Sequence, residues 1–277
     1  SIVGSFGLAL PDHPHSRQWV EHAVSQFNRQ MKFYVSEGSG RWIENPGNYY
    51  LHTWRVLTPF LLALHHLGDD RGFGHPKFRQ FCDFAVKTIT PAAPSTTILK
   101  DGPPKKKTLN DTQRVRMVPG IGDTGPIGPD VPSMPAFAAH AYSRIDPALS
   151  QRLMWAWRQG KGQLSNLYFT LTVPSLLFIN HDLPNVPPKL ASETLPEYGA
   201  VMRAEFGTPR ESYLLFKSGI GGARFHNDEH AFILYLRGVP VTLDGGFGWS
   251  TYKGSLHSTV TFDGNDYFMP RGDLARF

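Results

Sequence analysis

Residues 184–206 read PNVPPKLASETLPEYGAVMRAEF, and this stretch separates two kinds of sequence pattern. Pro184, Pro187 and Pro188 predict an irregular connection, because proline continues neither a helix nor an inner strand. Apolar residues recur every three or four positions before these prolines and alternate with polar residues after them. We therefore expect a helical part over residues 1–188 and the first part of an antiparallel β domain over residues 189–277.

Several segments of the first part have the periodicity of helices that bury one face. In residues 16–34, Trp19, Ala23, Phe27 and Met31 recur every four positions, which is the spacing of one helix face. Pro59 is expected to kink or split the second helix. The other predicted helices are 50–67, 77–89, 135–143, 147–159 and 164–179.

Short β-branched or aromatic runs bounded by Gly, Pro or Asp follow residue 189. The predicted strands are 198–206, 212–217, 231–237, 239–243 and 258–262. Residues 91–135 differ from both parts, since they combine prolines, glycines and the basic run Lys105–Lys107 without periodicity. We expect a long irregular excursion there.

The composition restricts the possible classes of protein. Hydrophobic residues make up 40% of the 277 and charged residues 18%, so the chain has material for a core and is not predominantly disordered. A membrane span is not expected, because no run approaches eighteen apolar residues. A single cysteine, Cys82, excludes an intrachain disulfide and a cysteine-based zinc cluster. The net charge of +5 favours anionic partners. Nucleic acid is not expected, since little beyond Lys105–Lys107 supports it.

A possible metal site lies near the end of the chain. If strands 239–243 and 258–262 pair as a hairpin, Asp244 faces His257, with opposed Cβ atoms about 5 Å apart. His226 joins them if the chain bends back before residue 231. Two imidazoles and a carboxylate suit zinc, with the fourth position left for water or substrate.

Other interpretations of these residues remain open. The two histidines could be surface residues, with Asp244 capping the turn at Gly245. Asp228 and His230 are additional candidate ligands, and Asp228 could instead orient a liganding histidine.

Residues 40–54 contain a second concentration of functional side chains, at the point where one predicted helix ends and the next begins. A tyrosine there can serve as base and acid if neighbouring cations lower its pKa. The alternative is that these aromatic residues only pack the helix start. The candidates are Trp42, Glu44, Asn48, Tyr49, Tyr50 and His52.

The segment 224–264 resembles the start of the β domain in heparinase II/III-like polysaccharide lyases, a group that includes alginate and oligoalginate lyases. That family has a His-x-His-x-Asp element, a Gly-x-x-hydrophobic-x-x-Asp-x-Gly turn, a Tyr, and a His-Asn-Thr-Val strand leading to Asp-Gly. Residues 42–49 are also similar to its Trp-x-Glu-x-x-x-Tyr element. The matching residues near the C-terminus are His226 to Asp228, Gly238 to Asp244 with Gly246, Tyr252, His257 to Val260, and Asp263 with Gly264.

The resemblance implies an α+β multidomain protein with an (α/α) toroid followed by an antiparallel β-sandwich. It implies zinc held by His226, Asp244 and His257, in a role that is mainly structural, with calcium the less suitable ion. It also implies a catalytic tyrosine at Tyr49 or Tyr50, where one inserted residue leaves the choice open.

This sequence departs from the family's pattern in two places. Arg224 replaces the first histidine of the His-x-His element, and Ser258 replaces the usual asparagine. Arginine can neutralise a carboxylate bidentately, but it cannot exchange protons. The family's Asn–His pair lies just upstream of the helix that opens here near Ser5, so we expect it immediately before Ser1. The chain is therefore expected to be an internal fragment, truncated at both ends.

The implied activity is β-elimination on a uronic-acid polysaccharide, in the periplasm or outside the cell, and a homodimer is possible. Arg224 would neutralise the substrate carboxylate, and Tyr252 is a second candidate acid. Trp42, Glu44, Asn48 and His52 would bind substrate.

Two alternatives remain. A glycoside hydrolase would need a carboxylate pair, for which Glu44, Asp123, Asp228 and Glu229 are candidates. An inactive relative would only bind acidic glycans.

Overall fold

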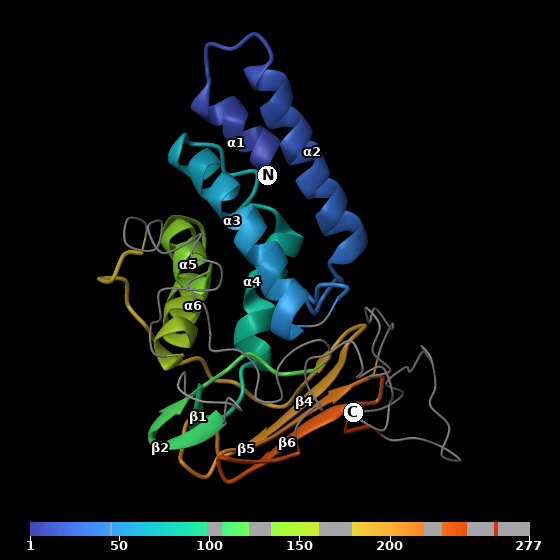
Figure 1. Cartoon of the computed structure of the whole chain (residues 1–277), viewed down its shortest axis with the longest axis vertical. Coiled ribbons are helices and arrows are strands. Elements are labelled where there is room, and N and C mark those ends of the chain that lie inside the picture. Colours follow the sequence, from blue (N-terminus) through green and yellow to red (C-terminus); the bar gives the residue numbers. More distant parts are fainter. Residues whose placement is uncertain are drawn as a thin grey trace.

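The computed structural model describes residues 1–44, 46–98, 107–121, 134–160, 179–218, 229–242 and 258–259. Helices come first along the chain, and a five-stranded sheet packs against one end of them (Figure 1). This arrangement confirms the predicted α+β class. The helices are α1 (Ile2–Ala9), α2 (Ser16–Tyr34), the π-helical turn η1 (Pro46–Tyr50), α3 (Leu51–His66), α4 (Pro76–Thr88), α5 (Met134–Ile145) and α6 (Pro147–Gln159).

Helical periodicity predicted α2 to α6 closely, but not α1 or η1. The bounds of α2 and α6 agree with prediction, and those of α3, α4 and α5 differ by one or two residues at each end. Helices α2 to α6 turn their apolar sides toward one continuous buried cluster, whereas α1 buries only Gly4 and Gly7 and leaves Ile2, Val3 and Phe6 exposed. The helix predicted at 164–179 falls almost wholly outside the described residues.

Helix α3 passes through Pro59 without being split in two. Proline cannot donate the usual backbone hydrogen bond. Next to the proline, the Thr58 hydroxyl donates to the carbonyl of Trp54, one turn back, at 2.7 Å. Buried Leu57 and Phe60 flank the proline and anchor this part of α3 in the core, so packing sustains the helix.

A β-hairpin occupies part of the segment for which the sequence predicted no regular structure. Strands β1 (Ala93–Ile98) and β2 (Lys107–Val115) pair antiparallel, and the register shifts between Pro94 and Ser95. Such a shift interrupts the alternation of side chains across a strand, which explains why the sequence shows no period of two here.

The second sheet is an antiparallel meander in the order β3–β4–β5–β6–β7. Its inner face includes Val201, Tyr213, Leu215, Ile233 and Tyr235, which belong to the same buried cluster as the helices. The Tyr213 hydroxyl donates to the carbonyl of Thr88, at the end of α4, at 2.8 Å. The strands are β3 (Glu193–Leu195), β4 (Gly199–Ala204), β5 (Ser212–Lys217), β6 (Phe232–Leu236) and β7 (Val239–Thr242).

The edge of β6 corrects one predicted pairing. Thr242 of β7 pairs with Leu234, while Thr259 forms a bridge with Ala231. The Phe232 amide donates to the Ser258 carbonyl at 2.8 Å, on the edge of β6 that also faces β7. Residues 239–242 and 258–259 therefore follow one another along β6. Among the described residues they do not pair with each other, in contrast to the predicted hairpin of 239–243 with 258–262.

A buried ionic cluster joins the sheet to the helical part. Glu211 accepts from Arg203 at 2.9 Å and from Arg116 at 2.6 Å, and all three side chains are 4% exposed or less. The arginines also donate to carbonyls around the end of α4, including those of Ile89 and Thr90. Because a buried charge needs complete pairing, these contacts hold the sheet and helices in one arrangement.

Candidate functional site

The loop between α2 and η1 brings Trp42 back against the end of α2. The Ile43 amide donates to the Tyr34 carbonyl at 2.9 Å, and Val35 bridges to Trp42. Gly40 makes the return possible, because its φ is +76° and a Cβ atom there would lie 2.0 Å from the Gln80 carbonyl oxygen.

Trp42 and Glu44 form a fixed pair in this loop. The Trp42 ring is nearly buried and meets Tyr34 edge-on at 5.5 Å between ring centroids. Its indole nitrogen donates to Oε2 of Glu44 at 2.9 Å. The aromatic ring thus sets the position of the carboxylate.

The π-helical turn η1 leads directly into α3 and carries both candidate tyrosines. A π turn closes over one more residue than an α turn, and such turns occur often at functional sites. Adjacent side chains on a helix point in different directions, so the turn gives Tyr49 and Tyr50 different surroundings. Asn48 belongs to the same turn, but its side chain lies outside the described part.

Tyr50 is part of the core. Its side chain is fully buried against Phe81 and Phe84, and its hydroxyl donates to the Phe81 carbonyl at 2.6 Å. Burial is the main reason why its pKa lies well above the usual 10. Tyr49, by contrast, is half-buried. Of the two tyrosines, only Tyr49 is partly exposed.

His52 lies on the exposed side of α3, one turn after Tyr49, beside Arg55. A guanidinium nitrogen of Arg55 lies 2.6 Å from Nδ1 of His52. Since arginine only donates, Nδ1 is the acceptor and the imidazole proton is on Nε2. Burial and then Arg55 lower the pKa of His52, while Glu44 opposes them. The two side chains present nitrogen donors to an anion.

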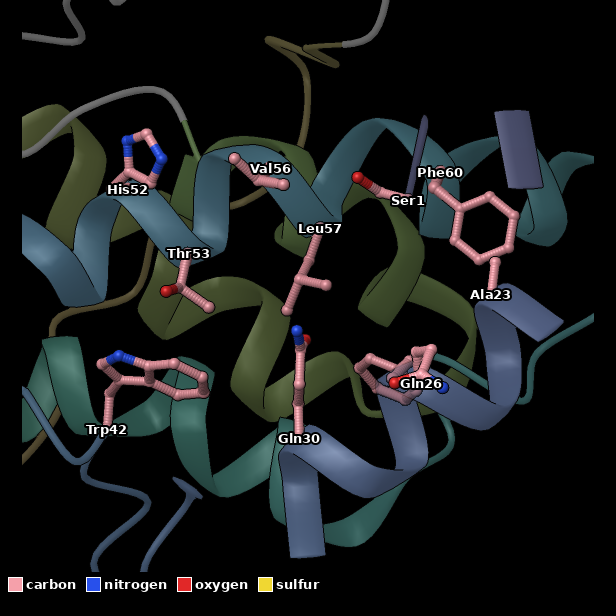
Figure 2. A pocket seen from close by; sticks show the side chains of 11 residues that line it. Ser1, Ala23, Gln26, Gln30, Trp42, His52, Thr53, Val56, Leu57 and Phe60 are labelled. Atoms are coloured by element: carbon pink, nitrogen blue, oxygen red, sulfur yellow. The ribbon is translucent and has the colours of Figure 1, made fainter. Parts of the chain in front are cut away.

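A cavity of about 170 Å³ opens beside these residues, between α2, α3 and the start of α1. Figure 2 shows Gln30 extending from α2 toward Leu57 of α3, with Thr53 and Trp42 on one side of it and Phe60 on the other. Trp42 and His52 are therefore brought to one cavity. Its lining comprises Ser1, Ala23, Gln26, Phe27, Gln30, Trp42, His52, Thr53, Val56, Leu57 and Phe60.

Many of the predicted site residues lie outside the described residues. These are Arg224, Tyr252, His226, Asp244 and His257, together with Asp123 and Asp228. In the part of the chain that the structure describes, no three His, Cys, Asp or Glu side chains are arranged to hold a metal ion. Over the same residues, no helix has the length and apolar character to cross a membrane.

Glu229 is described and lies in the sheet region rather than beside Glu44. Its carboxylate is buried 3.2 Å from Nζ of Lys217, on β5. His230 stacks on Phe216 at 6.3 Å. Both side chains therefore have packing partners in the sheet.

The sequence did not single out Gln26, Gln30 or Thr53. On a helix surface these residues look like an ordinary polar face. Arg55 also has no motif of its own, although its spacing of three from His52 places the two side chains on one face.

Comparison with known proteins identifies relatives by fold. No family model matches the chain, and no curated protein matches it. A solved heparan sulfate lyase from Pedobacter heparinus, in a mutant form, is similar over 97% of this chain at 15% identity, with a TM-score of 0.63. A heparinase III gene product is similar over 97% of this chain at 15% identity, with a TM-score of 0.64.

The chain spans 37% of the length of each of these two structures. At this level of identity the likeness concerns the fold, and it supports the predicted family at that level alone. The complete toroid and sandwich of the prediction are not established by it.

Proposed function

We propose that this chain is the central part of a polysaccharide lyase that cleaves uronic-acid-containing, anionic polysaccharides by β-elimination. The fold shared with heparan sulfate lyases supports the general class. The observation that carries the proposal is the grouping of Tyr49, the Trp42–Glu44 pair and the His52–Arg55 pair around the start of α3.

Tyr49 is the proposed base. Elimination needs a phenolate that removes the C5 proton of the uronate, after which the C4–O bond breaks and a C4–C5 double bond forms. The phenol must reach substrate, a requirement that half-buried Tyr49 meets and fully buried Tyr50 does not. His52 and Arg55 follow Tyr49 at the start of α3.

The remaining roles concern the carboxylate and the departing oxygen. Neutralising the carboxylate stabilises the enolate-like intermediate, which is the largest demand of this reaction. We assign this role to Arg224 and to residues upstream of Ser1. The departing glycosidic oxygen takes a proton from Tyr49 or Tyr252. Trp42, Glu44, Asn48 and His52 contact the sugar rings.

We extend the proposal to one zinc ion held by His226, Asp244 and His257. Thr242 pairs with Leu234 on one edge of β6, and Ser258 lies on the same edge, opposite Phe232. Asp244 and His257 are thus within two residues of neighbouring positions on one edge, which supports their convergence. Bound zinc would tie these strand ends together, whereas calcium would favour oxygen ligands.

Metal analysis tests this extension. We expect about one zinc per chain after gel filtration, lost in His257→Ala and retained in the matched variant His22→Ala on exposed α2. Equal zinc in both variants would remove His257 from the site.

A location in the periplasm or outside the cell belongs to the same proposal, because extended polysaccharides are found there. Assembly as a homodimer is compatible with it.

The decisive experiment separates elimination from hydrolysis. Heparan sulfate and alginate are incubated with the protein, and near-ultraviolet absorbance is followed together with reducing ends. Elimination produces a 4,5-unsaturated uronate that absorbs near-ultraviolet light. Reducing ends without this absorbance would indicate a hydrolase, and binding without either product would indicate a glycan-binding relative.

A further inference from the structure

A buried ion pair joins the end of β5 to the residues just before β6. Nζ of Lys217 lies 3.2 Å from Oε1 of Glu229, and the two side chains are 7% and 4% exposed. Neither carboxylate oxygen of Glu229 has a hydrogen-bonding partner among the described residues. A buried charge with incomplete pairing costs free energy that two apolar side chains in its place would not cost. Stability alone therefore does not account for this pair.

The backbone next to Glu229 also has an unfavourable conformation. The φ of His230 is +59°, in the left-handed region that is costly for a residue with a side chain. Two contacts hold the chain there. The His230 ring stacks on Phe216 at 6.3 Å between centroids, and the Lys217 amide donates to the Ala231 carbonyl at 2.8 Å. The surrounding structure thus fixes the point at which the chain enters β6.

The ion pair lies at the end of the sheet that contacts the candidate site. Lys217 is buried on the face of β5 that packs against the helices, and it pairs with Gly199 on β4. Two residues before Gly199, the Glu197 carbonyl accepts a hydrogen bond from Arg41, in the loop of residues 40–44. The ends of β5 and β6 are therefore held beside the loop that carries the Trp42–Glu44 pair.

We propose that Lys217 and Glu229 are positioning residues for the segment 219–228, which lies between them in the sequence. The inference rests on the proposed function, in which Arg224 of this segment neutralises the substrate carboxylate. Holding both ends of the segment beside the candidate site restricts where Arg224 can lie. A charge that is already in place stabilises an enolate-like intermediate without reorganisation during the reaction.

The test compares stability and turnover in the 277-residue chain, by urea unfolding and by absorbance of the unsaturated product. Glu229→Met leaves Lys217 buried without its countercharge, so it should lower both the urea midpoint and kcat. In the double variant Lys217→Met/Glu229→Met two apolar side chains replace the pair, and the midpoint should return to that of the unaltered protein or exceed it. Both kcat and kcat/KM should stay at least about 10-fold low, because Arg224 is no longer held in place.

Lys87→Met/Glu193→Met is the matched control. This pair also joins the sheet to the helical part, at 2.9 Å, but it does not flank residues 219–228. Its replacement should leave kcat unchanged. Glu229→Gln keeps the shape of the side chain and removes its charge, so it serves in place of the double variant if that protein does not fold, with the same expected loss of kcat.

Trypsin cleavage after Arg224, followed by mass spectrometry, gives a measurement that needs no turnover. Cleavage depends on the population of opened states, so it should be faster in Lys217→Met/Glu229→Met than in the unaltered protein and unchanged in the control. The proposal is overturned if kcat recovers together with the urea midpoint, or if the cleavage rate does not change.

These measurements separate the positioning role from the lyase activity. Faster cleavage in a protein that forms no unsaturated product would uphold the positioning of the segment and reject the lyase. Unsaturated product formed equally fast by the double variant would uphold the lyase and reject the positioning role.

Discussion

Arg41 in the helical part donates a hydrogen bond to the carbonyl oxygen of Glu197, in the turn between β3 and β4, at 3.3 Å. A second guanidinium nitrogen donates to the carbonyl of Ile43 at 3.0 Å. Arg41 is 4% exposed, so both bonds are shielded from water. A single side chain thus connects the sheet to the residue just before Glu44, and the sheet helps to set the Trp42–Glu44 pair.

Replacing Arg41 should impair both catalysis and stability. In Arg41→Met the carbonyls of Ile43 and Glu197 lose their donor and the loop can shift. A small misplacement of catalytic groups can lower the rate up to about 100-fold. We expect kcat for elimination to fall at least about 10-fold and the free energy of unfolding to fall by about 1–3 kcal/mol, because two buried carbonyls lose their donor. Arg41→Lys should restore only part of the rate, because lysine lacks the planar fork.

The matched control is Lys87→Met. Lys87 also joins the helical part to the sheet, through Glu193 at 2.9 Å, but lies away from Trp42. Its replacement should leave kcat unchanged. If both variants lower kcat equally, the effect belongs to the interface in general and not to Arg41.

Replacing Tyr49 should affect mainly activity, and replacing Tyr50 should affect mainly stability. Tyr49→Phe should abolish the unsaturated product while the free energy of unfolding changes by about 0.5 kcal/mol or less. Tyr50→Phe removes a buried hydrogen bond to the Phe81 carbonyl, so the free energy of unfolding should fall by about 0.5–1.5 kcal/mol, with turnover retained. Urea unfolding and absorbance measure the two effects. Loss of turnover in Tyr50→Phe alone would reverse our assignment.

Glu211 should be one of the residues on which stability depends most. In Glu211→Gln two buried arginines lose their countercharge, and breaking such a pair costs about 3–5 kcal/mol. Urea unfolding measures the loss. Glu205→Gln is the control, because its ion pair with Arg210 is exposed and worth about 0–1 kcal/mol. Similar losses in both variants would contradict this view of the cluster.

His140 should make the protein less stable in acid. Burial lowers its pKa below 6.5, and His66, His65 and Arg144 lower it further. The unfolded chain then binds more protons than the folded one, so stability is complete above about pH 6.5 and falls as the pH drops through the folded-state pKa. Asp70, paired with His65, is the nearby acidic group.

Chemical unfolding between about pH 5 and pH 7.5 tests this prediction. His140→Gln should flatten the pH dependence, and His22→Gln, on an exposed part of α2, should leave it unchanged. If the free energy of unfolding of His140→Gln depends on pH as it does in the unaltered protein, the acid sensitivity comes from other groups.

The helices were predictable because each buries one face, as the spacing in α2 shows. The burial of Tyr50 was not predictable, since it depends on contacts with Phe81, thirty-one positions away. The pairing along the edge of β6 could not be predicted from the sequence pattern either. Residues 239–243 and 258–262 both read as strands, and alternation alone does not say which neighbour each one pairs with.

The Arg116–Glu211–Arg203 cluster has a consequence for protein engineering. Arg116 belongs to the first part of the chain, and its two partners belong to the sheet. A chimera that joined this helical region to a sheet without an acid at the position of Glu211 would leave Arg116 buried without its countercharge. Recombination within this fold would therefore have to exchange Arg116 together with the sheet that neutralises it.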